Sequence, residues 1–188
     1  SKGVRTYHQA TAASINMTAM SDTSSGYAAG FAGKVAAIDP VALARIAVDK
    51  CRLSQNPQSL EPGEYEVILE PSAIAAMLAW LRFIGFGSRA FQQGTSFLAG
   101  RIGRKLTSEQ VTVLDNTFDP RFIGMPFDFE GVPRKKVVYI EKGVARGVVH
   151  DRQSAVKSKT KSTGHALPAP ESSEGAIGIN MIFAPGRT

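Results

Sequence analysis

The strongest constraint on the fold is the apolar run of residues 73–81, the longest in the sequence. A helix that spans a bilayer takes roughly 20 such residues, so this run is too short to cross a membrane. Pro71 and Ser72 precede it and a glycine-containing segment follows it, so the sequence predicts a helix over residues 73–84. That helix is apolar nearly all round, which predicts that it is buried.

The first third of the chain has the pattern of a hairpin followed by a helix. Residues 4–20 and 27–38 are typical of extended strands, and the polar cluster between them is typical of a turn. Asp39 can cap the free N–H groups of a helix whose first position is Pro40. The helix itself, residues 41–53, is amphipathic and carries the single cysteine, Cys51, which we expect to be a small buried thiol.

The remaining sequence predicts mostly strands and turns, because glycine and proline are frequent in it. We expect an α+β fold, with a hairpin plus helix in residues 1–60. A β-rich domain in residues 61–188 would then pack around the buried apolar helix. The expected strands are residues 64–69, 111–114, 137–140, 144–150 and 177–183, with a hairpin turn at residues 141–143 and a helical turn at residues 154–158.

Positive charge is concentrated in residues 134–161. This stretch has nine basic and two acidic residues, a net charge of +7 against +6 for the whole chain. Such a stretch can attract phosphate or an acidic peptide. Alternatively, it is a solvated sheet edge whose lysines and arginines prevent aggregation. It lacks the series of aromatic residues on which nucleic-acid bases stack, so we do not expect nucleic acid as a partner.

Motifs for phosphate binding, zinc binding and nucleophilic catalysis are missing from the sequence. The glycine-punctuated residues 94–103 do not match a Walker loop and are interpreted as structural turns. The three histidines, His8, His150 and His165, have no helical spacing that would hold zinc. No Gly-x-Ser-x-Gly nucleophile elbow occurs.

Two acidic residues form a possible polar site. Asp128 and Glu130 stand at strand spacing and would share one face of a strand, where they could bind a cation or act as an acid–base pair. Alternatively, they accept hydrogen bonds from backbone N–H groups at the turn of residues 131–133. Asp115 and Asp119 are further acidic candidates.

A second possible site is the loop formed by Ser162, Thr163, Gly164 and His165. Loops of this type often line binding sites, because they combine donors with a flexible backbone. The two hydroxyls, the close approach that glycine permits and the histidine ring could all contact a peptide.

Four stretches in fixed order resemble the TldD/PmbA family. Residues 125–133 resemble its "pfDdEG" signature, residues 140–144 its "lIe.Gvl" hairpin and residues 162–166 its "STGHa" loop. Residues 94–103 resemble its "stfl...G" stretch. The resemblance covers about residues 64–170.

The resemblance implies a subunit of a cytoplasmic metalloprotease of the TldD/TldE type, which trims unfolded or modified peptides. Metal-binding members carry His-Glu-x-x-x-His on the helix that corresponds to residues 71–80, where zinc is held and Glu activates water. This helix contains no histidine and no acid. We therefore expect the non-metal-binding PmbA/TldE type, without catalytic or metal-binding residues or a cofactor of its own. Zinc is expected in a TldD-like partner.

Two further expectations accompany this interpretation. The chain opens with Ser1-Lys2 and ends on a strand and turn, which suggests a fragment. The sequence lacks a secretory signal and has one cysteine, so we expect a cytoplasmic protein without a membrane anchor. The alternatives are a nucleic-acid or gyrase-associated binding protein that uses residues 134–161, and a self-contained hydrolase that uses Asp128, Glu130 and His165.

Overall fold

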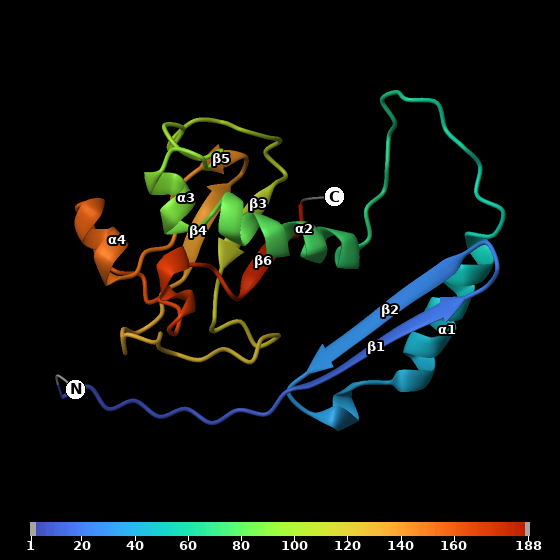
Figure 1. Cartoon of the computed structure of the whole chain (residues 1–188), viewed down its shortest axis with the longest axis horizontal. Coiled ribbons are helices and arrows are strands. Elements are labelled where there is room, and N and C mark those ends of the chain that lie inside the picture. Colours follow the sequence, from blue (N-terminus) through green and yellow to red (C-terminus); the bar gives the residue numbers. More distant parts are fainter. Residues whose placement is uncertain (1–2, 187–188) are drawn as a thin grey trace. The chain divides into compact units, whose positions relative to one another are not determined.

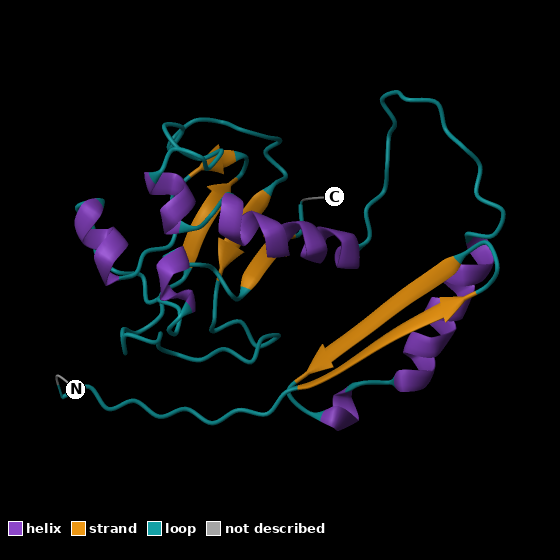
Figure 2. Ribbon diagram, viewed as in Figure 1, coloured by secondary structure: helices purple, strands orange, loops and turns teal. Residues whose placement is uncertain are grey.

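The structure, a computed structural model, describes residues 3–186. It divides into two compact units, one of residues 9–72 and one of residues 3–8 together with 73–186. We call the first the hairpin unit and the second the sheet unit, and Figures 1 and 2 show the elements of each. The mixture of helices and strands confirms the α+β class.

The hairpin unit is a two-stranded antiparallel sheet covered by one helix. Strands β1 (Ala13–Met20) and β2 (Ser25–Ala32) pair in register, and α1 (Pro40–Leu53) packs against β2. The helix comes so close that a Cβ atom on Gly26 would lie 2.0 Å from the carbonyl oxygen of Ala47. Glycine at this position therefore permits the contact between helix and sheet.

The predicted start of α1 and the environment of its cysteine are both confirmed. The Asp39 carboxylate accepts hydrogen bonds from the backbone N–H groups of Val41 and Ala42, each at 3.0 Å, so it caps the helix. Cys51 is buried at the interface between helix and hairpin. The short 3-10 helix η1 (Val35–Ala37) follows β2 and completes the unit.

The sheet unit is built on a four-stranded antiparallel sheet of order β5-β4-β3-β6. The strands are β3 (Thr112–Asp115), β4 (Val137–Glu141), β5 (Val144–Ala145) and β6 (Met181–Ala184). The predicted turn between β4 and β5 is confirmed, with positive φ angles of 47° at Lys142 and 77° at Gly143. Such angles at both central residues define the tight hairpin turn that matches strand twist.

Helix α2 (Pro71–Ile84) lies across one face of this sheet (Figure 2), and its predicted burial was wrong. Ile74, Leu78 and Leu81 pack on the core, at the spacing that places them on one face of a helix. Only Leu78 is fully buried, whereas Met77 is 51% and Trp80 73% exposed. The helix covers the core from one side instead of being surrounded by it.

Five predicted strands also differ from the structure. Residues 27–38 form a strand only up to Ala32, and residues 177–183 only from Met181 onward. Residues 64–69 form no strand and are exposed, with Ile68 at 99% exposure. Their β-forming side chains find no pleated neighbour in the described residues, and β propensity depends on such a neighbour. Of residues 144–150 only Val144 and Ala145 pair as a strand, and of residues 4–20 only the part from Ala13 onward.

Three short helices complete the sheet unit. They are α3 (Ser88–Gln92), α4 (Arg152–Lys157) and the 3-10 helix η2 (Glu171–Glu174). The core between these helices, α2 and the sheet contains Phe86, Leu98, Tyr139 and Val149, whose side chains are almost fully enclosed. The rings of Phe86 and Tyr139 stack with centroids 4.4 Å apart.

Candidate functional site

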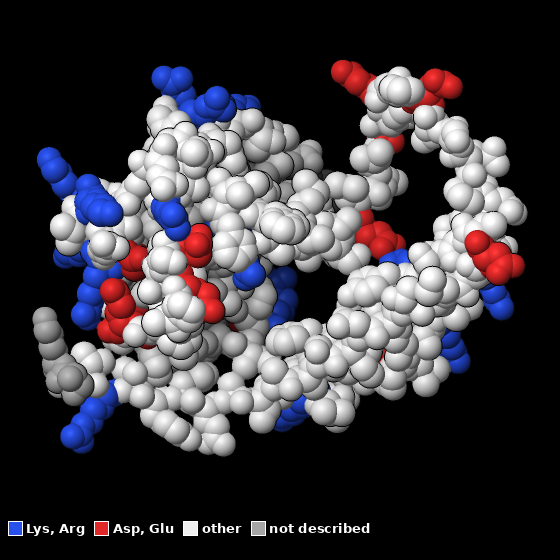
Figure 3. Space-filling model, viewed as in Figure 1, with Lys and Arg blue, Asp and Glu red and all other residues white. Residues whose placement is uncertain are grey.

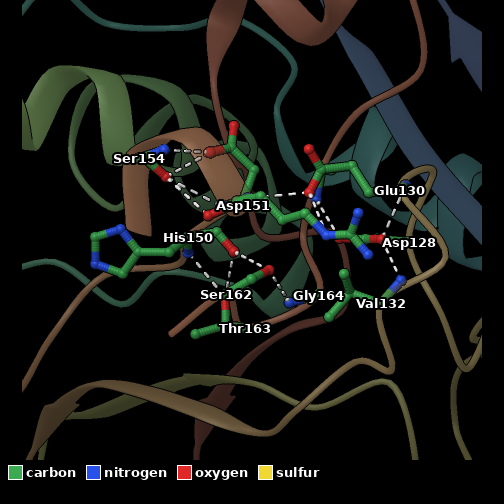
Figure 4. Close-up of polar contacts among 11 residues, drawn as sticks. Asp128, Glu130, Val132, His150, Asp151, Ser154, Ser162, Thr163 and Gly164 are labelled. Carbon is green, nitrogen blue, oxygen red and sulfur yellow. Dashed lines mark hydrogen bonds and ion pairs between the residues drawn. The ribbon is translucent and has the colours of Figure 1, made fainter. Parts of the chain in front are cut away.

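Asp128 holds together the turn in which it lies. Its Oδ1 atom accepts hydrogen bonds from the backbone N–H groups of Glu130 at 2.9 Å and Val132 at 2.8 Å (Figure 4). Its Oδ2 atom accepts a third from the N–H group of Ala166 at 3.0 Å. The carboxylate is 2% exposed and has little room for a cation or a substrate. The alternative in which Asp128 binds backbone N–H groups is therefore the one that the structure supports.

Glu130 does not form an acid–base pair with Asp128. The two lie in a turn and not on one face of a strand. Asp128 is buried, whereas Glu130 faces α4. The Glu130 carboxylate accepts the backbone N–H of Arg152 at 3.0 Å and lies 4.0 Å from that residue's guanidinium group. It thus ties the turn to the start of α4.

The polar groups of the loop at Ser162 are used within the protein. Ser162 Oγ donates to the carbonyl oxygen of His150 at 3.2 Å and accepts from the N–H of Gly164 at 3.1 Å (Figure 4). Thr163 Oγ1 accepts from the N–H of His150 at 2.8 Å and lies 3.0 Å from its carbonyl oxygen. These bonds fix the loop against residue 150.

Gly164 brings this loop against the Asp128 turn. Its φ angle is +73°, and a Cβ atom there would lie 2.4 Å from the carbonyl oxygen of Pro133. A larger residue would push the two segments apart. Together with the bond from Asp128 to Ala166, this contact makes the stretches 125–134 and 162–166 one structural unit.

His165 is enclosed, although the sequence suggested a ring that could contact a peptide. Its exposure is 0%, and its Nε2 atom lies 3.1 Å from Asp115 Oδ1. Its Nδ1 atom lies 2.9 Å from both oxygen atoms of Thr163. Asp115 is equally buried, and its Oδ2 atom accepts the N–H of Asn180 at 2.8 Å.

The order Asp115–His165–Thr163 places an acid, a base and a hydroxyl in series, as in a catalytic triad. Catalysis needs the hydroxyl to face a position that substrate can reach. Here Thr163 Oγ1 is bonded to the backbone of residue 150, and His165 is closed from solvent. The arrangement therefore does not support a hydrolase that uses His165.

Two buried side chains near Asp115 were missed by the sequence analysis. Arg134 is 4% exposed, and its Nε and Nη1 atoms have no hydrogen-bond partner among the described residues. Burial lowers the pKa of Arg134, while Asp115, Asp128 and Tyr139 raise it. Burial also raises the pKa of Tyr139 well above its usual value. The positions of Arg134 and Tyr139 in the sequence did not indicate that they lie near Asp115.

His150 and Asp151 form no oriented catalytic pair. Asp151 caps α4 by accepting the backbone N–H and the hydroxyl of Ser154 (Figure 4). The ring of His150 points away from these groups, and its Nδ1 atom is buried without a partner among the described residues. Burial lowers the pKa of His150, although Asp151 partly opposes that shift.

The side chains of residues 3–186 do not fit a zinc site. Zinc is held by Cys, His, Asp or Glu side chains, and α2 contains none of them. Among residues 3–186, no three such side chains gather in a metal-binding arrangement. What the site provides chemically is a rigid arrangement of loops, held by buried hydrogen bonds.

Comparison with known proteins identifies the family. The family model of the PmbA/TldA metallopeptidase C-terminal domain matches residues 62–188. The chain belongs to this family. The match covers residues 73–186 of the sheet unit and also residues 62–72 of the hairpin unit, and the TldD/PmbA resemblance of the sequence is confirmed.

Curated PmbA/TldA relatives agree. A metalloprotease of Archaeoglobus fulgidus is 42% identical over 97 residues, which cover 50% of this chain and 22% of that protein. An uncharacterised Methanocaldococcus jannaschii protein is 28% identical over 121 residues, which cover 64% of this chain and 29% of that protein. The chain thus spans less than a third of the length of these relatives.

Two solved structures share the fold. TldE from Thermococcus kodakarensis is 26% identical with a TM-score of 0.75, over 94% of this chain and 41% of that chain. A Thermotoga maritima protein, named a candidate modulator of a DNA gyrase, has a TM-score of 0.79 at 21% identity, over 93% of this chain and 40% of that chain. The second likeness shows the fold alone.

Proposed function

We propose that this chain is part of a TldE-like, non-catalytic subunit of a heterodimeric zinc metalloprotease that processes unfolded or modified peptides. Its partner would be a TldD-like subunit that holds the zinc. We place the complex in the cytoplasm. Within the described residues, no helix is long and apolar enough to cross a membrane, and the single cysteine needs no oxidising compartment.

The observation that carries the proposal is the composition of α2. Its single charged residue is Arg82, and the rest of the helix offers no atom that binds zinc or activates water. The similarity to a TldE supports the same interpretation. In this proposal, a subunit with such a helix contributes to proteolysis by shaping the site or by binding the substrate.

The loop of residues 162–165 would contribute by position. Its hydroxyls and the ring of His165 are bonded internally, so the loop keeps one shape without a ligand. We propose that this rigid loop forms part of the wall of the peptide channel. In that role the path of the loop's backbone matters more than any free hydrogen-bond donor.

The proposal is tested with the intact protein, alone and co-expressed with a partner that carries His-Glu-x-x-x-His. We expect zinc only in the partner, measured by elemental analysis after dialysis, and cleavage of an unfolded protein only by the complex. A partner in which the motif's Glu is replaced by Gln is the control. About one zinc per chain in the isolated protein would contradict the proposal.

The nucleic-acid alternative gains nothing from the structure. Arg134, the first residue of the basic stretch, is buried beside Asp115 and Asp128. The remaining basic residues lie before β4, in the turn that follows it, after β5, in α4 and in the segment after α4. No aromatic platform for bases accompanies them within residues 3–186, because Tyr139 is buried in the core.

A further inference from the structure

A cleft of about 810 Å³ opens in the sheet unit between α3, α4 and η2. Its volume lies within the range of roughly 300–1,000 Å³ that is typical of ligand sites. Helices α3 and α4 contact each other. The family motifs in the sequence do not include this cleft.

The walls of the cleft are held in place by internal bonds. Gln92 Nε2 of α3 donates to the carbonyl oxygen of Ser154 at 2.8 Å and to Ser158 Oγ at 3.0 Å, which fixes α3 against α4. On the other side, Ser88 Oγ accepts the N–H of Ala176 at 2.9 Å. The chain passes so close to α3 there that a Cβ atom on Gly175 would lie 2.9 Å from Ser88 Oγ. The cleft is therefore formed before any ligand binds.

Side chains that can both donate and accept hydrogen bonds dominate the lining. Gln93, Gln153 and Ser172 lie in it with polar side chains, and Phe91 is its one large apolar residue. A lining of this kind suits a polar ligand that offers both donors and acceptors, such as the main chain of an extended peptide. It does not suit a lipid, which needs an apolar wall.

The charges of the lining leave one cation available. Arg89 donates to the carbonyl oxygen of Ser173 at 2.9 Å and lies 3.4 Å from the carboxylate of Glu174. The carboxylate of Asp151 is engaged by Ser154. Lys157 is exposed and forms no ion pair within residues 3–186. In the region of α4, both basic and acidic side chains reach the surface (Figure 3).

We propose that this cleft binds an extended peptide segment with a carboxylate group beside Lys157. The inference rests on the proposed function and names the substrate class: acidic peptides. One short segment connects the cleft with the loop of residues 162–165. Residue 150 holds Ser162 and Thr163 through its backbone, whereas Asp151, which directly follows, lines the cleft. A peptide held in the cleft would therefore lie next to the loop.

The test measures peptide binding separately from cleavage. The intact protein is titrated against fluorescein-labelled octapeptides of alternating Glu-Gly, Ser-Gly and Lys-Gly, and against labelled oligo-dT of eight nucleotides, by fluorescence anisotropy. We expect the Glu-Gly peptide to bind most tightly. Lys157→Glu replaces an attraction with a repulsion and should weaken that binding at least about five-fold.

Lys136→Glu is the matched control, because Lys136 is exposed, lies outside the cleft and changes the net charge equally. Lys157→Gln, which only removes the charge, should give an intermediate loss, and circular dichroism checks the fold of each variant. The proposal is overturned by equal binding of the Glu-Gly and Ser-Gly peptides, by tighter binding of oligo-dT, or by equal losses in Lys157→Glu and Lys136→Glu. Selective acidic-peptide binding without cleavage by the complex would sink only the proposed function.

Discussion

Replacing Asp128 by Ala tests whether this carboxylate holds the site together. The change removes the acceptor of three backbone N–H groups, those of Glu130, Val132 and Ala166. The N–H of Ala166 is buried and would remain unsatisfied, at a cost of about 1–3 kcal/mol. The other two lie on half-buried residues that water can reach, so each loses a net bond of about 0.5–1.5 kcal/mol. The free energy of unfolding should fall by about 2–6 kcal/mol.

Urea denaturation followed by circular dichroism measures this loss. Trp80, the single tryptophan, lies in the sheet unit and gives a second signal by fluorescence. Glu171→Ala, an exposed carboxylate in the same unit, is the control and should change stability by less than about 0.5 kcal/mol. Hydrogen exchange should accelerate at residues 130, 132 and 166 in the Asp128 variant. A loss below about 1 kcal/mol with unchanged exchange would refute a structural role.

Three further substitutions test other parts of the structure. Leu78→Ala should lower the free energy of unfolding by about 2–5 kcal/mol in urea, whereas Met77→Ala on the exposed face should cost under about 0.5 kcal/mol; equal losses would contradict the orientation of α2. Gly143→Ala should cost more than about 1 kcal/mol, because φ at this residue is +77° and the added Cβ atom would lie 2.3 Å from the carbonyl oxygen of Thr107. Gly147→Ala should cost much less, because its added Cβ atom would lie in open space. Because burial lowers the pKa of His150, the unfolded chain takes up a proton before the folded protein does as pH falls below about 6.5. The free energy of unfolding should therefore decrease as pH falls through this range, and His150→Gln should flatten the decrease. An NMR titration midpoint of His150 at or above 6.5 would argue against this reasoning.

Local patterns in the sequence predicted local structure well. The cap at Asp39, the hairpin turn at Lys142 and Gly143 and the helix at α2 depend on neighbouring residues, and all three are confirmed. The burial of α2 was predicted wrongly, because an apolar composition does not show how much neighbouring structure covers a helix. The strand at residues 64–69 failed for a related reason, since a strand needs a partner and its own residues do not identify one.

The candidate site could be predicted only in part. The turn at Asp128 and the loop at Ser162 were visible as motifs, and one of the alternatives for Asp128, bonds to nearby N–H groups, is what the structure contains. The partner of His165 was not visible, because Asp115 lies 50 residues away in the chain. Arg134 was counted as part of a basic surface, and only the fold shows that it is buried.

The close contact at Gly164 has a consequence for how sequences of this fold can vary. The carbonyl oxygen of Pro133 leaves no room for a Cβ atom on Gly164, and the carboxylate of Asp128 accepts the N–H of Ala166 two residues further on. A substitution on one side would therefore require a matching change on the other, some 30 residues away in the chain. In an alignment of homologous chains, these two stretches should covary as a pair, and a chain that carries one without the other should have lost the local geometry of both.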